Sequence, residues 1–88
     1  MADNESTMIQ THDGSKTWWK DGEIHREDGP AFENEDGSNI WVRMGKIHRE
    51  DGPAVERADG INRWFLFGKE YNCVEWMLQV HELNQKNT

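Results

Sequence analysis

Apolar residues along the chain stand in short stretches, and glycine-containing turns separate one stretch from the next. Asp-Gly pairs that begin at Asp13, Asp36 and Asp59 lie between β-prone residues. An Asp-Gly pair in this setting is a strong signal for a tight hairpin turn, because glycine adopts positive φ without a steric penalty. The pattern predicts a mainly β fold in which the chain runs as an antiparallel meander.

The pattern returns with a step of 23 residues. Trp18, Trp41 and Trp64 keep this step, and the octapeptide IHREDGPA occurs at 24–31 and again at 47–54. Self-similarity at a fixed period is the sequence signature of a repeat architecture. We therefore expect a disordered tail, then a single repeat domain that ends in a short helix. The expected ranges are 1–7 for the tail, 8–84 for the domain, 8–30, 31–53 and 54–71 for its three units, and 73–84 for the helix.

The turns also predict which residues face one another across the strands, because turn length sets the register of a hairpin. With a two-residue turn at Asp21-Gly22, Trp19 faces Ile24, and with one at Asp36-Gly37, Phe32 faces Trp41. A turn at Met44-Gly45 likewise makes Trp41 face His48. We expect the tryptophan of each such row to be its packed residue. The three expected rows are Ile9–Trp18–His25, Phe32–Trp41–His48 and Val55–Trp64–Tyr71.

The C-terminal residues show a helical pattern instead. Asn72 is a good N-cap residue, and Glu75 follows it three positions later, as in a capping box. A helix here would cover one end of the sheet, as the last unit of a stack requires. The sequence leaves open which face of the sheet the helix covers. The helical face expected to pack carries Cys73, Trp76, Met77, Val80 and Asn84.

The two HREDGPA copies carry His, Glu and Asp within four residues, which invites a metal-binding or acid–base interpretation. A metal site needs ligands that converge in space, and one small domain rarely keeps two copies of a catalytic triplet. A stack of units, by contrast, has to copy its connections. We therefore expect structural joints, with no catalytic residue, metal ligand or cofactor. The expected joint residues are His25, Asp28, Pro30, His48, Asp51 and Pro53.

Composition narrows the classes of function. The chain has 88 residues and a formal net charge of −7, which disfavours direct binding to nucleic acid or to an anionic membrane. Cys73 is the only cysteine, which excludes an internal disulfide and favours the cytoplasm. We expect Cys73 to be a buried helix residue. No apolar stretch reaches the length of a membrane span.

The pattern DG-x3-W-x3-G-x2-HREDGPA, over about residues 13–71, resembles the short tandem repeats of small bacteriophage and bacterial proteins. These units are similar to MORN repeats, which are β-hairpin units of the same length with an aromatic–glycine signature. The start of a MORN unit, Y-x-G-x-W-x2-G, is absent here. The resemblance implies an open β meander that serves as a binding scaffold. It implies no catalytic residues, and the lipid binding of MORN proteins does not carry over to an acidic chain.

The function expected from these features is that of a non-enzymatic protein-binding module. Its concrete form is a small acidic phage-type protein in the host cytoplasm, which binds and modulates or inhibits a host protein with a basic surface. One alternative is a self-assembling structural protein that pairs through its sheet edges, and another is a metal-dependent enzyme that uses the histidines and carboxylates. DNA mimicry by the carboxylates also stays open. The expected partner-binding residues are Trp19, Phe32, Trp41, Glu33, Glu35 and Glu56.

Overall fold

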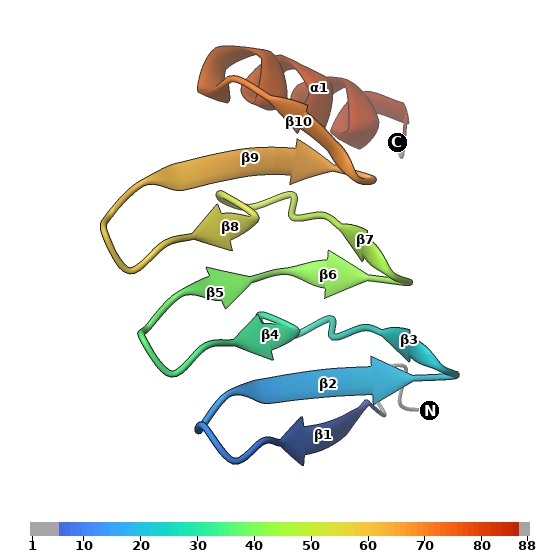
Figure 1. Cartoon of the computed structure of the whole chain (residues 1–88). Coiled ribbons are helices and arrows are strands. Elements are labelled where there is room, and N and C mark those ends of the chain that lie inside the picture. The colour runs from blue at the N-terminus through green and yellow to red at the C-terminus, as the bar shows by residue number, and fades with distance from the viewer. Residues whose placement is uncertain (1–5, 87–88) are drawn as a thin grey trace.

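A computed structural model describes residues 6–86, which form a thin antiparallel sheet with one helix at its C-terminal end (Figure 1). The extents of the molecule are 41 × 36 × 16 Å. The elements are β1 (Thr7–Gln10), β2 (Lys16–Lys20), β3 (Glu23–Ile24), β4 (Phe32–Glu33), β5 (Asn39–Ile40), β6 (Val42–Arg43), β7 (Lys46–Ile47), β8 (Val55–Glu56), β9 (Asn62–Leu66), β10 (Lys69–Tyr71) and α1 (Cys73–Lys86).

The expected mainly β fold with a C-terminal helix is confirmed. Strand β1 begins at Thr7, one residue before the expected start of the domain, and residues 1–5 of the expected tail lie outside the described range. The main sheet has the order β1-β2-β4-β5-β8-β9-β10, with β3 also paired to β2, and β6 pairs with β7. No helix in the described part of the chain has the length and apolar character needed to cross a membrane.

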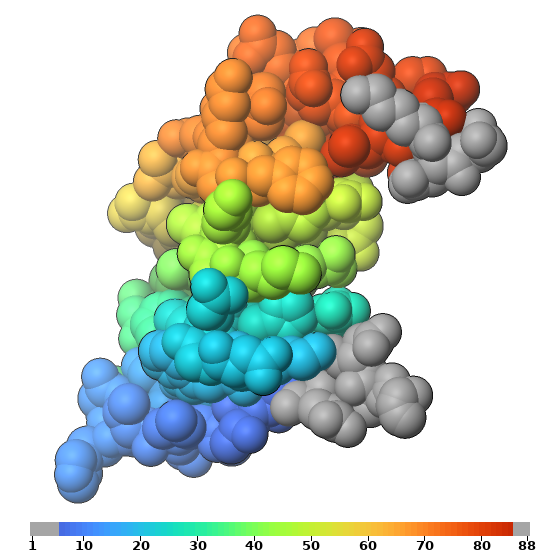
Figure 2. Space-filling view, turned by 90° about the vertical axis from the view of Figure 1, so that its right-hand side faces the viewer, coloured from blue at the N-terminus to red at the C-terminus, as the bar shows by residue number. Residues whose placement is uncertain are grey.

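One row of hairpin tips follows the expected two-residue turns. Asp21, Met44 and Phe67 have φ values of 53°, 52° and 52°, and the glycine after each also has positive φ. Positive φ at both central positions defines a type I′ turn. Trp19 consequently lies opposite Ile24, as the two-residue turn predicts. Figure 2 views these tips end on, where they stack tier upon tier.

The other row of turns is one residue longer than expected, and the prediction for Asp36-Gly37 is wrong. Asn34 N donates to Ser38 O, Gly37 N donates to Asn34 O, and Gly37 has a φ of 97°. This is a three-residue loop, built as a type I turn followed by a left-handed glycine. The Asp36 side chain favours it, because Asp36 Oδ1 accepts a hydrogen bond from Ser38 N.

The longer loop shifts the register by one residue. Phe32 lies opposite Ile40 and not opposite Trp41. The same shift places Met8 opposite Trp18 and Val55 opposite Arg63, so the expected Ile9–Trp18, Phe32–Trp41 and Val55–Trp64 pairings are wrong. The other half of each row is correct: His25 N donates to Trp18 O, His48 N donates to Trp41 O, and Tyr71 lies opposite Trp64.

A shift of one residue moves a side chain to the other face of a sheet. Phe32 therefore shares a face with Ile40 and, through strand alternation, with Val42. Trp41 and Trp64 lie on the opposite face, and α1 packs on that face, because the rings of Trp64 and Trp76 are 4.8 Å apart. The buried apolar residues are few: Ala31, Val42, Ala54, Phe65, Leu66 and Trp76.

Helix α1 begins where the sequence predicts. Asn72 Oδ1 accepts a hydrogen bond from Glu75 N at 2.8 Å, which confirms Asn72 as the N-cap. Trp76 is the buried residue of the helix, and Met77 is exposed. The expectation that Cys73 is buried is wrong, because this first helical residue lies on the solvent side. The helix also runs two residues beyond its expected end.

Replacement of Trp76 by alanine tests how much the helix stabilises the sheet. We expect Trp76→Ala to lower the free energy of unfolding by about 3–5 kcal/mol, because it removes a buried indole and its packing on Trp64. Urea unfolding followed by circular dichroism measures the loss. The control is Leu78→Ala on the same helix, which should cost less than about 0.5 kcal/mol because Leu78 is 60% exposed. Similar losses for both variants would contradict the packing of α1.

Candidate functional site

Each HREDGP segment is a loop that leaves the sheet and returns to the same tryptophan. In the first copy His25 N donates to Trp18 O, and Trp18 N donates to Ala31 O. In the second copy Trp41 makes the same two bonds with His48 and Ala54. The peptide groups of each tryptophan thus hold both ends of one loop, so the loop cannot slide along the sheet.

An arginine closes each loop over its tryptophan. The guanidinium carbon of Arg49 lies 3.8 Å from the centre of the Trp41 ring. Arg49 Nε donates to Asp51 Oδ1 at 2.7 Å, and Nη1 donates to Pro53 O at 3.0 Å and to Glu56 Oε2 at 3.1 Å. A planar guanidinium can stack on a ring and fill several acceptors at once, whereas an ammonium cannot.

The first copy has the same arrangement. Arg26 stacks on Trp18 at 3.9 Å, and its Nε donates to Asp28 Oδ1 at 3.0 Å. Its Nη1 donates to Pro30 O at 3.1 Å and to Glu33 Oε2 at 3.5 Å. The three repeating tryptophans are half-buried and not fully packed. A guanidinium covers one side of two of them, Trp18 and Trp41.

A side chain in place of the glycine of each loop would displace this arginine. A Cβ on Gly52 would lie 2.9 Å from Arg49 Cζ, and a Cβ on Gly29 would lie 3.0 Å from Arg26 Cζ. Neither glycine has positive φ, so the reason is space for the guanidinium and not backbone conformation.

Both nitrogens of each loop histidine are engaged. His25 Nδ1 accepts a hydrogen bond from Met44 N at 2.8 Å, and His48 Nδ1 accepts one from Phe67 N at 2.9 Å. With Nδ1 as the acceptor, the proton of the neutral ring lies on Nε2. Nε2 then donates to Glu27 at 3.1 Å in the first copy and to Glu50 at 2.8 Å in the second.

These histidines therefore join one hairpin to the next. Each ring lies on one hairpin and accepts its bond from the tip of the following one. Both rings are buried, and a buried polar group is stable only when it is hydrogen-bonded. Within residues 6–86, no group of three or more His, Cys, Asp or Glu side chains is arranged to hold a metal ion.

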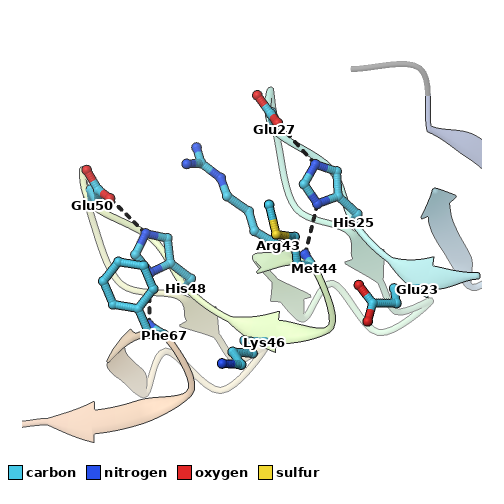
Figure 3. Close-up of a pocket in the computed structure, with 9 residues that line it drawn as sticks. All are labelled: Glu23, His25, Glu27, Arg43, Met44, Lys46, His48, Glu50 and Phe67. Carbon is cyan, nitrogen blue, oxygen red and sulfur yellow. Dashed lines mark hydrogen bonds and ion pairs between the residues drawn. The ribbon is translucent and has the colours of Figure 1, made fainter. Parts of the chain in front are cut away.

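A groove runs along the hairpin tips beside the histidines (Figure 3). Its volume is ≈ 540 Å³. The His48–Glu50 pair lies at the left of this view and the His25–Glu27 pair at the right, with Arg43 between them. Met44 and Phe67 are exposed at the tips, and the Phe67 ring lies 4.3 Å from the His48 ring. The groove thus mixes carboxylates, cations and exposed apolar groups. Its lining is Glu23, His25, Glu27, Arg43, Met44, Lys46, His48, Glu50 and Phe67.

A second, more apolar groove lies on the sheet face opposite α1. Its volume is ≈ 450 Å³, and Glu23 is its only charged lining residue among those that the structure describes. We call its large apolar residues the apolar face. The apolar face consists of Trp19, Ile24, Phe32, Ile40, Val42 and Ile47.

The structure separates the residues expected to bind a partner. Trp19 and Phe32 lie together on the apolar face. Trp41 lies under Arg49, and Glu33 and Glu56 accept hydrogen bonds from Arg26 and Arg49, so these three belong to the loops. The remaining residue, Glu35, is exposed in the β4–β5 loop.

The expected partner-binding residues include two residues of the apolar face, Trp19 and Phe32, and omit its other four; the stacking of the arginines on tryptophan was not predicted. Ile40 and Val42 alternate along one strand run, which was the available signal for a shared face. The arginine stack joins two residues on either side of a hairpin turn, so no periodicity within a single strand predicts the contact. No family model, curated protein or solved structure matches this chain.

Replacement of Arg49 by lysine tests whether the guanidinium closes the loop. We expect Arg49→Lys to lower the free energy of unfolding by about 1–3 kcal/mol, because lysine keeps the charge but cannot stack and fill three acceptors together. The control is Arg57→Lys, where the arginine is half exposed and donates to Asp59. We expect a change below about 0.5 kcal/mol there. Equal effects would mean that charge alone matters at Arg49.

The acid stability of the protein should depend on Asp51. The hydrogen bond from Arg49 lowers the pKa of this carboxyl below its ordinary value. A lowered folded-state pKa stabilises the fold above the unfolded pKa of about 3.9, and this stability is lost as pH falls through the folded value. Urea unfolding between about pH 5 and pH 2 should therefore show a smaller acid loss for Asp51→Asn than for the original chain. The difference should vanish when Arg49→Met is present in both chains; its persistence would point to another partner.

Proposed function

We propose that the chain is a non-enzymatic protein-binding module, made of three hairpin units of 23 residues and covered at one end by α1. The register supports this division: Phe32 opposite Ile40 corresponds to Ile9 opposite Thr17 and to Val55 opposite Arg63. A stack of this kind offers an extended surface to a partner, because each unit contacts only its neighbours.

The observation that carries the proposal is the identical bonding of the two HREDGPA copies. The histidine, glutamate, arginine and aspartate side chains of each copy are hydrogen-bonded to one another in the same pairs, at distances that agree between the copies to within a few tenths of an ångström. A catalytic base or ligand needs a free lone pair in a cleft. Both nitrogens of His25 and of His48 are instead hydrogen-bonded: Nδ1 to the next hairpin and Nε2 to a glutamate of the same loop.

The surface chemistry supports a protein as the ligand. The formal net charge of −7 favours a partner with a basic surface, since complementary charge speeds association. The apolar face and the exposed Met44 and Phe67 supply area that association can bury. The resemblance to short phage-type repeats favours a host protein, which the chain would modulate or inhibit in the cytoplasm.

A second candidate is self-assembly through a sheet edge. Among the strands that the structure describes, β1 pairs only with β2, and its four residues are exposed. An unpaired edge of this kind can add a strand from another copy. Light scattering at high protein concentration separates the candidates, because a protein-binding module of this type stays a monomer.

Affinity capture with reconstitution tests the proposed function. We expect the immobilised chain to retain one protein from a bacterial lysate at about 0.15 M salt, and the purified pair to form a stoichiometric complex that weakens at high salt. A variant that removes two surface charges, Glu35→Gln with Asp36→Asn, should slow association because it weakens the attraction to a basic partner. Its fold should be unchanged, since asparagine keeps the acceptor for Ser38 N. If no protein is retained at about 0.15 M salt, the proposal fails.

The enzyme alternative has its own test. Zinc, manganese and calcium should leave the melting temperature unchanged, because a metal that binds the folded state would raise it. A rise that is lost in His25→Asn with His48→Asn would favour metal binding over the proposed function.

A further inference from the structure

The apolar face ends abruptly at the third hairpin. Positions 40 and 47 hold Ile40 and Ile47, whereas the positions 23 residues later hold Arg63 and Glu70. Arg63 donates through Nε and Nη2 to both oxygens of Glu70, at 2.9 and 2.7 Å. The same fold thus carries isoleucines at two positions in one hairpin and a two-bond ion pair in the next.

The ion pair shields the apolar residue beneath it. Arg63 Cζ lies 5.5 Å from the centre of the Phe65 ring, and Phe65 is only 9% exposed. Around Val42, which corresponds to Phe65, the flanking side chains are the two isoleucines, and they are half-buried. The third hairpin therefore has a polar cover on this face, while the first two present aliphatic and aromatic groups to solvent.

Within the described residues, no second layer lies over the apolar face. The strands of the first two hairpins lie side by side in one layer, and α1 contacts β9 and β10 (Figure 1). The helix packs on the opposite face, against Trp64. Domains normally bury each apolar sheet face against another element. The face that Trp19, Phe32 and Ile40 share therefore has the character of an interface.

Charge decides between the occupants. A second copy would bring another net charge of −7 against the first, which opposes face-to-face pairing. Glu23 lines both this groove and the groove at the hairpin tips, so it lies at the margin of the apolar face. The β4–β5 loop, which follows Phe32, carries Glu35 and Asp36. Carboxylates at the margin of an apolar groove complement lysine or arginine on a ligand.

We propose that the apolar face binds one amphipathic segment of the partner protein, whose apolar side chains are flanked by lysine or arginine. This inference rests on the proposed function and names the surface and the chemistry that it recognises. The ion pair of Arg63 and Glu70 marks the end of the binding surface. Trp19 and Phe32 are its aromatic anchors, and Glu23 receives the cation of the segment.

A display library of random peptides of about 12 residues, an average helix length, is the probe. The wild-type chain should select peptides that combine apolar residues with an excess of lysine and arginine. Ile40→Arg with Ile47→Glu transfers the ion pair of the third hairpin to the second, so the variant has a precedent for folding within this chain. It should bind the selected peptides at least about tenfold more weakly at an unchanged melting temperature.

Two control variants make the assignment specific. Arg63→Glu with Glu70→Arg reverses the ion pair of the third hairpin at constant net charge, and it should leave peptide binding within about twofold of the original. Glu23→Gln should remove the advantage of cationic peptides over neutral ones and leave the apolar contacts in place.

Several outcomes would overturn the inference. These are the selection of neutral or acidic peptides, equal peptide binding by the Ile40→Arg with Ile47→Glu variant, or no selection at all. A wild-type dimer that this variant dissociates would make a second copy the occupant. If the protein captured from lysate still binds the variant, the proposed function stands and the surface is wrong. If peptides are selected as expected but no protein is captured, the proposed function fails.

Discussion

The stack of a guanidinium on an indole is the interaction on which the rest of the structure depends. The guanidinium of Arg49 lies over the Trp41 ring and donates to an aspartate, a proline carbonyl and a glutamate from that position. Because the arginine is polar on its rim and stacks through its face, it covers the tryptophan and also satisfies the acceptors of the loop. The glycine beside it follows from the same contact, since a Cβ would meet the guanidinium. The aspartate, glycine and proline of the loop thus all contact this one arginine.

The stack of arginine on tryptophan explains how a chain with 34% hydrophobic residues forms a sheet about one layer thick. At the C-terminal end another contact replaces this stack, because Tyr71 and Asn72 occupy the positions where His and Arg would continue the pattern. Trp76 then covers Trp64, and its Nε1 donates to Arg49 O at 3.0 Å. An indole from α1 therefore does for the last tryptophan what arginine does for the others.

The sequence predicted the β meander, the helix cap at Asn72 and the type I′ tips, since each depends on residues close together in the chain. It did not predict the length of the loop at Asp36-Gly37, because a two-residue turn and a three-residue loop can both use an Asp-Gly pair. The hydrogen bond from Asn34 N to Ser38 O identifies the longer loop. That single residue reversed which side chains share a face. Trp41 was therefore expected on the binding surface, where Ile40 lies. The sequence did not predict the stack of arginine on tryptophan, because this contact forms only when the loop folds back over the strand that carries the tryptophan.

The fold thus divides its chemistry between two tasks. The histidines, arginines and carboxylates of the loops hold hairpins together, and the apolar face stays open on the other side of the sheet. A double-mutant cycle on Trp41→Leu and Arg49→Met tests the central interaction most directly, through the free energies of unfolding of the four proteins. A favourable coupling of about 0.5–2 kcal/mol between the two side chains is the expected result. Additive effects, with a coupling below about 0.3 kcal/mol, would contradict the account.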